Sequence, residues 1–284
     1  MRAVLAAIRI GLLDMRGDLR RFGLLIICLA VGTALISGVS SVGASIRQAV
    51  QDNAAVLMGG DVELSRADRQ ATAEELALIS RFGRVSYVVD TNVRAEVGAN
   101  SAFVDLISVG DTYPLLGAVG SPQLPAGETP FGFLSYRDGR FGALVNPLML
   151  DQLGIKVGDT LEIAGTEFEA RGALTSLPDA AVRGFRLGLP AVITPEALAV
   201  LSDRTSPLPG LGTFFRYKVV LAEGDADTGK AALEAALADP SWTVRSAREG
   251  LGPMVRYYDL FMRFLVIVGL ASLLIGGVSV WTSI

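Results

Sequence analysis

Two long apolar runs flank a stretch in which hydrophobic and polar positions are mixed. Residues 22–46 contain no charged side chain, and neither do residues 264–284. A membrane-spanning helix needs about 20 predominantly apolar residues, and an uncharged run of about 18 already marks a candidate. The pattern therefore predicts transmembrane helices at 22–46 and 260–284, with one large domain between them.

Short periods of two and of 3.6 residues alternate within that domain. The predicted elements are strands at 59–65, 84–97 and 101–110, a helix opened by Thr72, and later a strand at 215–223, a helix at 227–239 and a strand at 241–247. Thr72 and Glu75 have the spacing of a capping box. The order β-α-β-β and then β-α-β is that of a split βαβ sandwich with a long insertion.

The insertion, residues 111–213, has elements of its own. Asn146 followed by Pro147 predicts a helix start, and Gly154 predicts its end. The segment from Lys156 to Leu174 has the pattern of a β-hairpin, and Thr194 before a proline opens another short helix. We expect a mostly-β subdomain here.

The predicted fold class is an α+β membrane protein. Two transmembrane helices flank an extracytoplasmic split-βαβ domain that carries an inserted, mostly-β subdomain. The expected parts are a cytoplasmic amphipathic helix at 1–21, the first transmembrane helix at 22–46, a split subdomain at 47–110 and 214–255, the inserted subdomain at 111–213, and the second transmembrane helix at 260–284.

Charge at the N-terminus predicts the orientation. Residues 1–21 contain five arginines and only two aspartates, and such a bias favours the cytoplasmic side of a membrane. The large domain is then expected in the periplasm of a cell with an inner membrane, on a multi-pass protein. Two alternatives stay open: the leader is a basic tail instead of an interfacial helix, or the first apolar run is a cleaved signal peptide. Its length, greater than the usual 7–15 residues, argues against cleavage.

Composition excludes several classes of function. Only 19% of the residues are charged, against about a quarter in soluble domains, and residues 48–262 are acidic, which argues against nucleic acid as a partner. The chain has no histidine and a single cysteine, Cys28. We therefore expect no Ser-His or Cys-His catalysis, no usual zinc site and no intrachain disulfide. No catalytic, cofactor-binding or metal-binding residue is predicted, and the chain is not expected to be an enzyme.

Two polar motifs suggest chemistry but are better explained structurally. Gly224 to Lys230 has the spacing of a phosphate-binding loop, yet the next residue is Ala231, where the motif needs Ser or Thr. A capped turn is the better interpretation. The pairs Glu74–Glu75 and Glu167–Glu169 could do acid–base work, but a helix's first turn and a solvated strand face explain them as well.

Small residues recur at helical spacing in both apolar runs. Close approach of membrane helices needs such residues, and we expect helix packing through Ala30, Ala34, Gly38, Gly269, Ser272 and Gly276. The alternative is that Gly and Ala are simply common in membrane helices. Neither uncharged run, 22–46 or 264–284, contains an ionisable residue that would indicate a proton relay.

Three motifs in this order carry a family resemblance. They are LMGGDVEL at 57–64, LDQLGIKVGDTLEI at 150–163 and LASLLIGGVSV at 270–280. Together with the basic leader, they resemble the FtsX-like/MacB-type family of ABC transporter permeases, and most of all its YbbP-type branch.

The resemblance implies a permease that works with a separate cytoplasmic ABC ATPase subunit. ATP-driven movement would pass through the spans to the outer domain, which would move a lipid-like or hydrophobic cargo or activate a periplasmic partner. Other expected partners are membrane lipids and further spans of the same permease. Because the chain ends within the second predicted span, we expect it to be the N-terminal part of a longer product. Two other classes stay open: a membrane-anchored scaffold or regulatory domain, and, less favoured, an anchored hydrolase.

Overall fold

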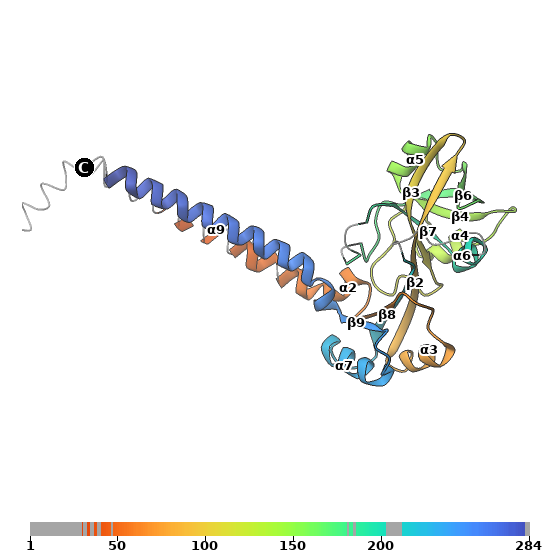
Figure 1. Ribbon diagram of the computed structural model, residues 1–284, viewed down its shortest axis with the longest axis horizontal. Helices are drawn as coiled ribbons and strands as arrows, with labels where there is room; N and C mark the ends of the chain where they lie inside the picture. The colour runs from red at the N-terminus through yellow and green to blue at the C-terminus, as the bar shows by residue number, and fades with distance from the viewer. Residues whose placement is uncertain are drawn as a thin grey trace, which may run out of the picture. The chain divides into compact units, whose positions relative to one another are not determined.

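The computed structural model describes residues 30, 33–34, 37–38, 41–46, 48–180, 182–183, 186–202 and 212–281. These fall into two units. One comprises Met1–Val50 with Pro253–Ile284, and the other comprises Gln51–Gly252. Figure 1 shows helix α9 in the first unit and a mixed α+β structure in the second. We describe each unit separately.

Helix α9 (Gly252–Trp281) is the main element of the first unit, and the described residues between Ala30 and Val50 are also helical. Several large apolar side chains of α9 are exposed, among them Phe261, Phe264 and Ile267. Among the described residues, no helix combines the length and the apolar character that crossing a membrane requires. The expected amphipathic helix at 1–21 lies outside the described residues.

An antiparallel sheet with the order β9-β1-β8-β2 forms one part of the second unit, which we call the open sheet. Its strands are β9 (Thr243–Ser246), β1 (Val62–Arg66), β8 (Phe214–Leu221) and β2 (Gly83–Val97). Helices α3 (Ala73–Ile79) and α7 (Ala226–Leu237) pack on one face through Ile79 and Leu233. This element order and pairing confirm the split βαβ arrangement.

Strand β2 is long enough to enter a second structure, a closed ring of six strands. The ring runs from β2 to β3 (Asn100–Val109), β7 (Leu189–Ile193), β4 (Phe141–Val145), β6 (Thr166–Ala173) and β5 (Thr160–Ile163). It closes where β5 pairs with Ala95 and Glu96 of β2. The pairs β3–β7 and β4–β6 are parallel, and the others are antiparallel.

Alternate residues of all six ring strands form one apolar core. Because side chains of a strand alternate between its faces, residues such as Val104, Ile163 and Phe168 lie together inside the ring. Helices α5 (Pro147–Leu153) and α6 (Pro195–Ser202) add to this core. A second cluster, which includes Val88, Ile107 and Leu134 of α4 (Pro130–Leu134), covers the outer face of β2 and β3.

Local signals in the sequence place most helix ends correctly. Thr72 and Glu75 form the expected capping box. The side chain of Asn146 accepts a hydrogen bond from the backbone N–H of Leu148, and Gly154 ends α5 with φ of 73°, a conformation that glycine adopts without steric cost. The predicted hairpin is β5–β6, and the predicted helix after Thr194 is α6.

The predicted division into two subdomains is less simple than the boundaries at 110/111 and 213/214 suggest. Strands β2 and β3 were assigned to the inner subdomain, yet they supply Val93, Ala95 and Val104 to the ring core. The open sheet and the ring thus share strands, and Gln51–Gly252 forms one compact unit. The residue boundaries themselves stay a prediction.

The seam that closes the ring carries three glutamates in a row. Glu96 of β2 faces Glu162 of β5, which in turn faces Glu167 of β6, and all three are exposed. Like charges directly opposite each other destabilise a sheet, whereas each opposite-charge pair contributes roughly 0.2–1 kcal/mol. Glu162→Lys is therefore expected to raise the urea midpoint of unfolding. Glu223→Lys, which makes the same charge change outside the ring, is the control. An equal rise in both variants would contradict the seam explanation.

Candidate functional site

The predicted helix-packing residues are only partly described. Ala30, Ala34 and Gly38 are exposed, and Gly269 is buried in α9. Ser272 and Gly276 belong to α9, but their side chains lie outside the described set. Their role in helix packing stays a prediction.

The Gly224–Lys230 segment is a capped helix start, as the sequence indicated. The carboxylate of Asp225 accepts hydrogen bonds from the backbone N–H groups of Asp227 and Thr228, so these amides are already paired. The Nζ atom of Lys230 lies 2.8 Å from Glu249 Oε1 and 3.7 Å from Glu234 Oε1. The backbone amides and the lysine that a phosphate would need are therefore already paired within the protein.

Three of the four carboxylates in the two pairs lie close to arginines. Glu75 lies 2.7 Å from Arg69 and 3.2 Å from Arg66, while Glu74 is exposed. Glu169 lies 2.8 Å from Arg171. Glu167 lies 3.5 Å from Arg140. Among the described residues, no group of three or more His, Cys, Asp or Glu side chains is placed to hold a metal ion.

A set of eight buried or partly buried charges stands out instead, and we call it the charge network. It lies on the face of the open sheet opposite α3 and α7. It comprises Glu63 of β1, Asp90 of β2, Asp105 of β3, Arg216 and Lys218 of β8, and Asp179, Arg183 and Arg186 from the segment between β6 and β7. Four carboxylates thus meet four cations, and the network carries no formal net charge.

Asp90, which is fully buried, is the centre of one half of the network, formed with Arg183, Arg186 and Arg216. Its Oδ1 accepts a short hydrogen bond from Arg183, and its Oδ2 lies 2.5 Å from Arg216 Nε and 3.4 Å from Arg186 Nη2. Arg186 also lies 3.7 Å from Asp105. Three guanidinium groups therefore converge on one carboxylate, two of them from the segment between β6 and β7.

The other half of the network joins the segment between β6 and β7 to strands β1 and β8. Lys218 forms a close ion pair with Glu63 and lies 3.6 Å from Asp179. Glu63 also lies 3.0 Å from Arg216. The hydroxyl of Tyr113 donates a hydrogen bond of 3.0 Å to Asp179. Because buried charges are costly unless they are paired, each of these charged groups depends on its partners on the neighbouring strand or segment.

Burial and pairing shift the pKa values in opposite directions. Burial alone would raise the pKa of Glu63, but Lys218 and Arg216 outweigh burial and hold it below the ordinary value. For Asp179, burial is likewise outweighed by Arg183 and Lys218, so its pKa is lowered. Burial raises the pKa of Asp105 above its ordinary value despite Arg183 and Arg186.

Sequence reasoning did not single out the charge network. A usable signal existed, because Asp105 and Lys218 each stand between apolar residues inside a predicted strand, and Asp90 follows two valines in another. A charged residue at such a position has either to reach solvent or to find a buried partner. The partners are remote, with Arg183 coming 93 positions after Asp90.

Asp105 differs from Glu63 and Asp179 because its pKa is raised and theirs are lowered, and this gives a prediction. Among the described residues, no group donates a hydrogen bond to its Oδ1 atom. Because its pKa is raised in the folded protein, stability falls as pH rises from the ordinary aspartate value through the folded pKa. Asp105→Asn removes this penalty and is expected to stabilise the protein by up to about 1 kcal/mol at pH 7.

The check is urea unfolding of parent and variant at pH values from 4 to 8. The difference in unfolding free energy should grow in favour of the variant as pH rises, then become constant. Contributions of Glu63 and Asp179, which change with pH in the opposite sense, are common to both proteins and cancel. A variant less stable than the parent at pH 7 would contradict the prediction.

Comparison with known proteins adds the family. Residues 22–237 match the family described as the MacB-like periplasmic core domain. The extracellular domain of the noncanonic ABC-type transporter YknZ from Gram-positive bacteria is similar at 13% identity, over 65% of this chain and 99% of that one, with a TM-score of 0.43. A domain of a protein assigned as a permease from Porphyromonas gingivalis is 8% identical, over 66% and 91% of the chains, with a TM-score of 0.42. No curated protein matches the chain.

The family match covers three quarters of the sequence, including the open sheet up to the end of α7 and the whole ring. It confirms the MacB-type part of the resemblance that the sequence motifs indicated. The YbbP-type branch is not confirmed. This chain belongs to the family of the MacB-like periplasmic core domain.

Proposed function

We propose that the chain is the N-terminal part of an ABC transporter permease, with Gln51–Gly252 as its extracytoplasmic domain. In this proposal a separate cytoplasmic ATPase drives movement of that domain. The family match supports the permease class, and the order of sequence motifs supports the YbbP-type branch. The same resemblance supports a lipid-like or hydrophobic cargo, by analogy alone.

The proposal includes two transmembrane helices, at 22–46 and 260–284, in an inner membrane. Their support is the absence of charge from residues 22–46 and 264–284 and the excess of arginine before the first run. Exposed apolar side chains of α9, including Leu260, Phe264 and Ile267, are suited to contact lipid or neighbouring helices.

One structural observation carries the mechanical part of the proposal. Helix α2 (Ala54–Met58) begins the second unit and helix α8 (Ala247–Gly250) ends it, and the two pack against each other. A Cβ atom added to Gly250 would lie 2.9 Å from the sulfur of Met58, so the contact is tight. The first and last helices of the second unit, α2 and α8, therefore meet in one contact. A shift of the chain before α2 relative to the chain after α8 acts directly on this contact.

We also propose that the chain has no catalytic activity of its own. Its support is the sequence without histidine and the charge network, in which carboxylates and cations pair with one another. Such a network holds segments together.

The test is affinity purification of the full-length gene product from its native membrane in mild detergent. Eluates are assayed for bound ABC ATPase and for ATP hydrolysis, with an untagged preparation as the control. Co-purification of an ATPase whose turnover changes with the permease would support the proposal. Recovery of a periplasmic protein without any ATPase would contradict it and favour the regulatory scaffold.

A further inference from the structure

Helix α9 carries its charged residues in its first turns and none after them. Between Gly252 and Arg263 it contains Arg256, Asp259 and Arg263, whereas residues 264–284 are uncharged. The helix continues through this change without a break (Figure 1). In the membrane arrangement proposed above, the boundary between lipid headgroups and acyl chains therefore falls near Arg263.

The two arginines of this part of α9 share one exposed face of the helix. Seven residues bring an α-helix back to within about 20° of the same direction, and they advance it by about 10 Å along its axis. The side chains of Arg256 and Arg263 are both exposed. Gly269 is buried and Met262 is half-buried, and both lie on another face of α9. The face with the arginines is therefore left uncovered by the described residues.

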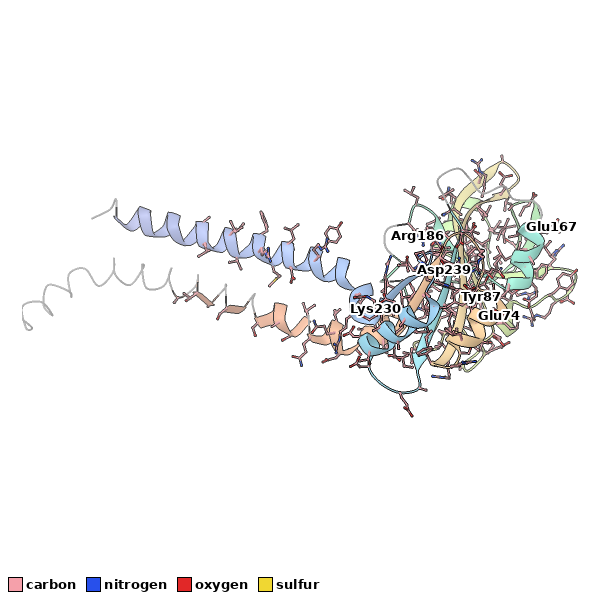
Figure 2. The ribbon with its side chains drawn as sticks, turned by 60° about the horizontal axis from the view of Figure 1, so that its bottom comes forward. Glu74, Tyr87, Glu167, Arg186, Lys230 and Asp239 are labelled. Atoms are coloured by element: carbon pink, nitrogen blue, oxygen red, sulfur yellow. The ribbon has the colours of Figure 1, made fainter. Side chains whose placement is uncertain are left out.

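Aromatic side chains accompany the two arginines. Tyr257, Phe261 and Phe264 are each more than half exposed, and Figure 2 shows the described side chains of α9 projecting from the ribbon. Tyrosine is enriched where a membrane meets water, because its ring is apolar and its hydroxyl is polar. Tyr257 precedes Arg263 and Phe264 follows it, so the order along the helix matches the change from headgroups to acyl chains.

The protein itself does not account for the charge of these arginines. Among the described residues, no carboxylate forms an ion pair with Arg256 or Arg263, whereas Lys230, labelled in Figure 2, lies 2.8 Å from Glu249. Orientation does not explain them either, because excess arginine marks the cytoplasmic end of a span and these residues precede the extracytoplasmic end of the proposed one. An anionic partner outside the chain would complement them.

We propose that this face of α9 binds the phosphate groups of anionic phospholipids in the extracytoplasmic leaflet. Because helical side chains lean toward the N-terminus, Arg263 reaches outward from the acyl boundary into the headgroups, where a guanidinium binds phosphate through two parallel hydrogen bonds. Arg256 lies about 10 Å farther out, within about one Debye length, and adds attraction through solvent. The site rests on the proposed function, since it requires α9 to enter a membrane.

The test measures lipid preference with the full chain reconstituted into mixed bilayers. Ile267→Trp places a reporter on an exposed position four residues after Arg263, Trp281→Phe removes the other tryptophan of α9, and Trp242 is buried in the second unit. Bromine on an acyl chain quenches tryptophan fluorescence on contact. One bilayer contains brominated phosphatidylglycerol and plain phosphatidylcholine, and the other has the bromine on the phosphatidylcholine. The ratio of the two quenching values reports how strongly this face prefers the anionic lipid.

The reporter protein is expected to prefer phosphatidylglycerol about fivefold or more, because one arginine near an anionic surface is worth about fivefold in binding. Arg263→Gln should remove most of this preference and Arg256→Gln a smaller part. Added salt should weaken the contribution of Arg256 more than that of Arg263, since only the former acts through solvent. The matched control is Arg248→Gln, which makes the same charge change at an exposed ion pair of the second unit and should leave the preference unchanged.

Two results would overturn the lipid site and leave the transmembrane helix standing. One is equal quenching by the two brominated lipids in the reporter protein, and the other is the same loss of preference in Arg248→Gln as in Arg263→Gln. Quenching by brominated phosphatidylcholine in every variant shows that position 267 still lies among acyl chains. If neither lipid quenches the reporter, α9 does not enter the bilayer, and the membrane span of the proposed function fails together with the site.

Discussion

Asp90→Ala is expected to lower the free energy of unfolding by about 3–5 kcal/mol, which is the usual cost of breaking a buried ion pair by removing one partner. Asp90 is fully buried and faces Arg183, Arg186 and Arg216. Without it, three guanidinium groups converge on an empty space. Arg216 retains Glu63, but Arg183 loses its described hydrogen-bond acceptor on the sheet.

The measurement is urea unfolding of the full chain in detergent, with tryptophan fluorescence as the signal. Asp227→Ala removes a carboxylate from an exposed pair, 3.2 Å from Arg248, and serves as the control, because exposed pairs are worth about 0–1 kcal/mol. If Asp90→Ala and Asp227→Ala cost the same, the network contributes little to stability and Asp90 is dispensable.

Phe168→Ala is expected to be comparably severe, at about 3–5 kcal/mol, because it leaves a cavity in the core of the ring. The side chain of Phe168 is fully buried, and the centroid of its phenyl group lies 6.1 Å from that of Phe141. Phe168 also stands in β6, which joins β5 and β4. A cavity there is bordered by strands on both sides and cannot collapse easily.

Thermal unfolding and urea unfolding should agree for this variant. Leu148→Ala, at a position of α5 that is 65% exposed, is the control and should change stability by less than about 0.5 kcal/mol. Phe168→Leu keeps much of the volume and should lose less than the alanine variant. If alanine and leucine prove equal at this position, packing of Phe168 does not support the ring.

The charge network shows why a strong feature can escape sequence reasoning. Asp90 and Asp105 fall within hydrophobic strand patterns, so each is visible as an anomaly. Their partners, Arg183 and Arg186, lie in a segment with neither helical nor strand period. Only the fold brings the two sets together, because a charge is recognised by distance in space and not by spacing along the chain.

The ring illustrates a similar limit for the sheet. The hairpin β5–β6 and the strands β2 and β3 follow from alternation and turn residues, which are local properties. The parallel pairs β3–β7 and β4–β6 join strands separated by many residues. No local pattern specifies such a partner, so the sequence predicted an inserted subdomain but not that β2 and β3 would help to close it.

The sequence by itself determined the features whose physics is local. These are the two uncharged runs, the capped starts of α3 and α5, the order of the split βαβ elements, and the motifs that indicated the MacB-type family. The tertiary structure alone decided the closed ring, the pairing of eight charges and the path of the segment between β6 and β7. These depend on contacts between distant segments, whose free energy arises only when burial removes water from both partners at once.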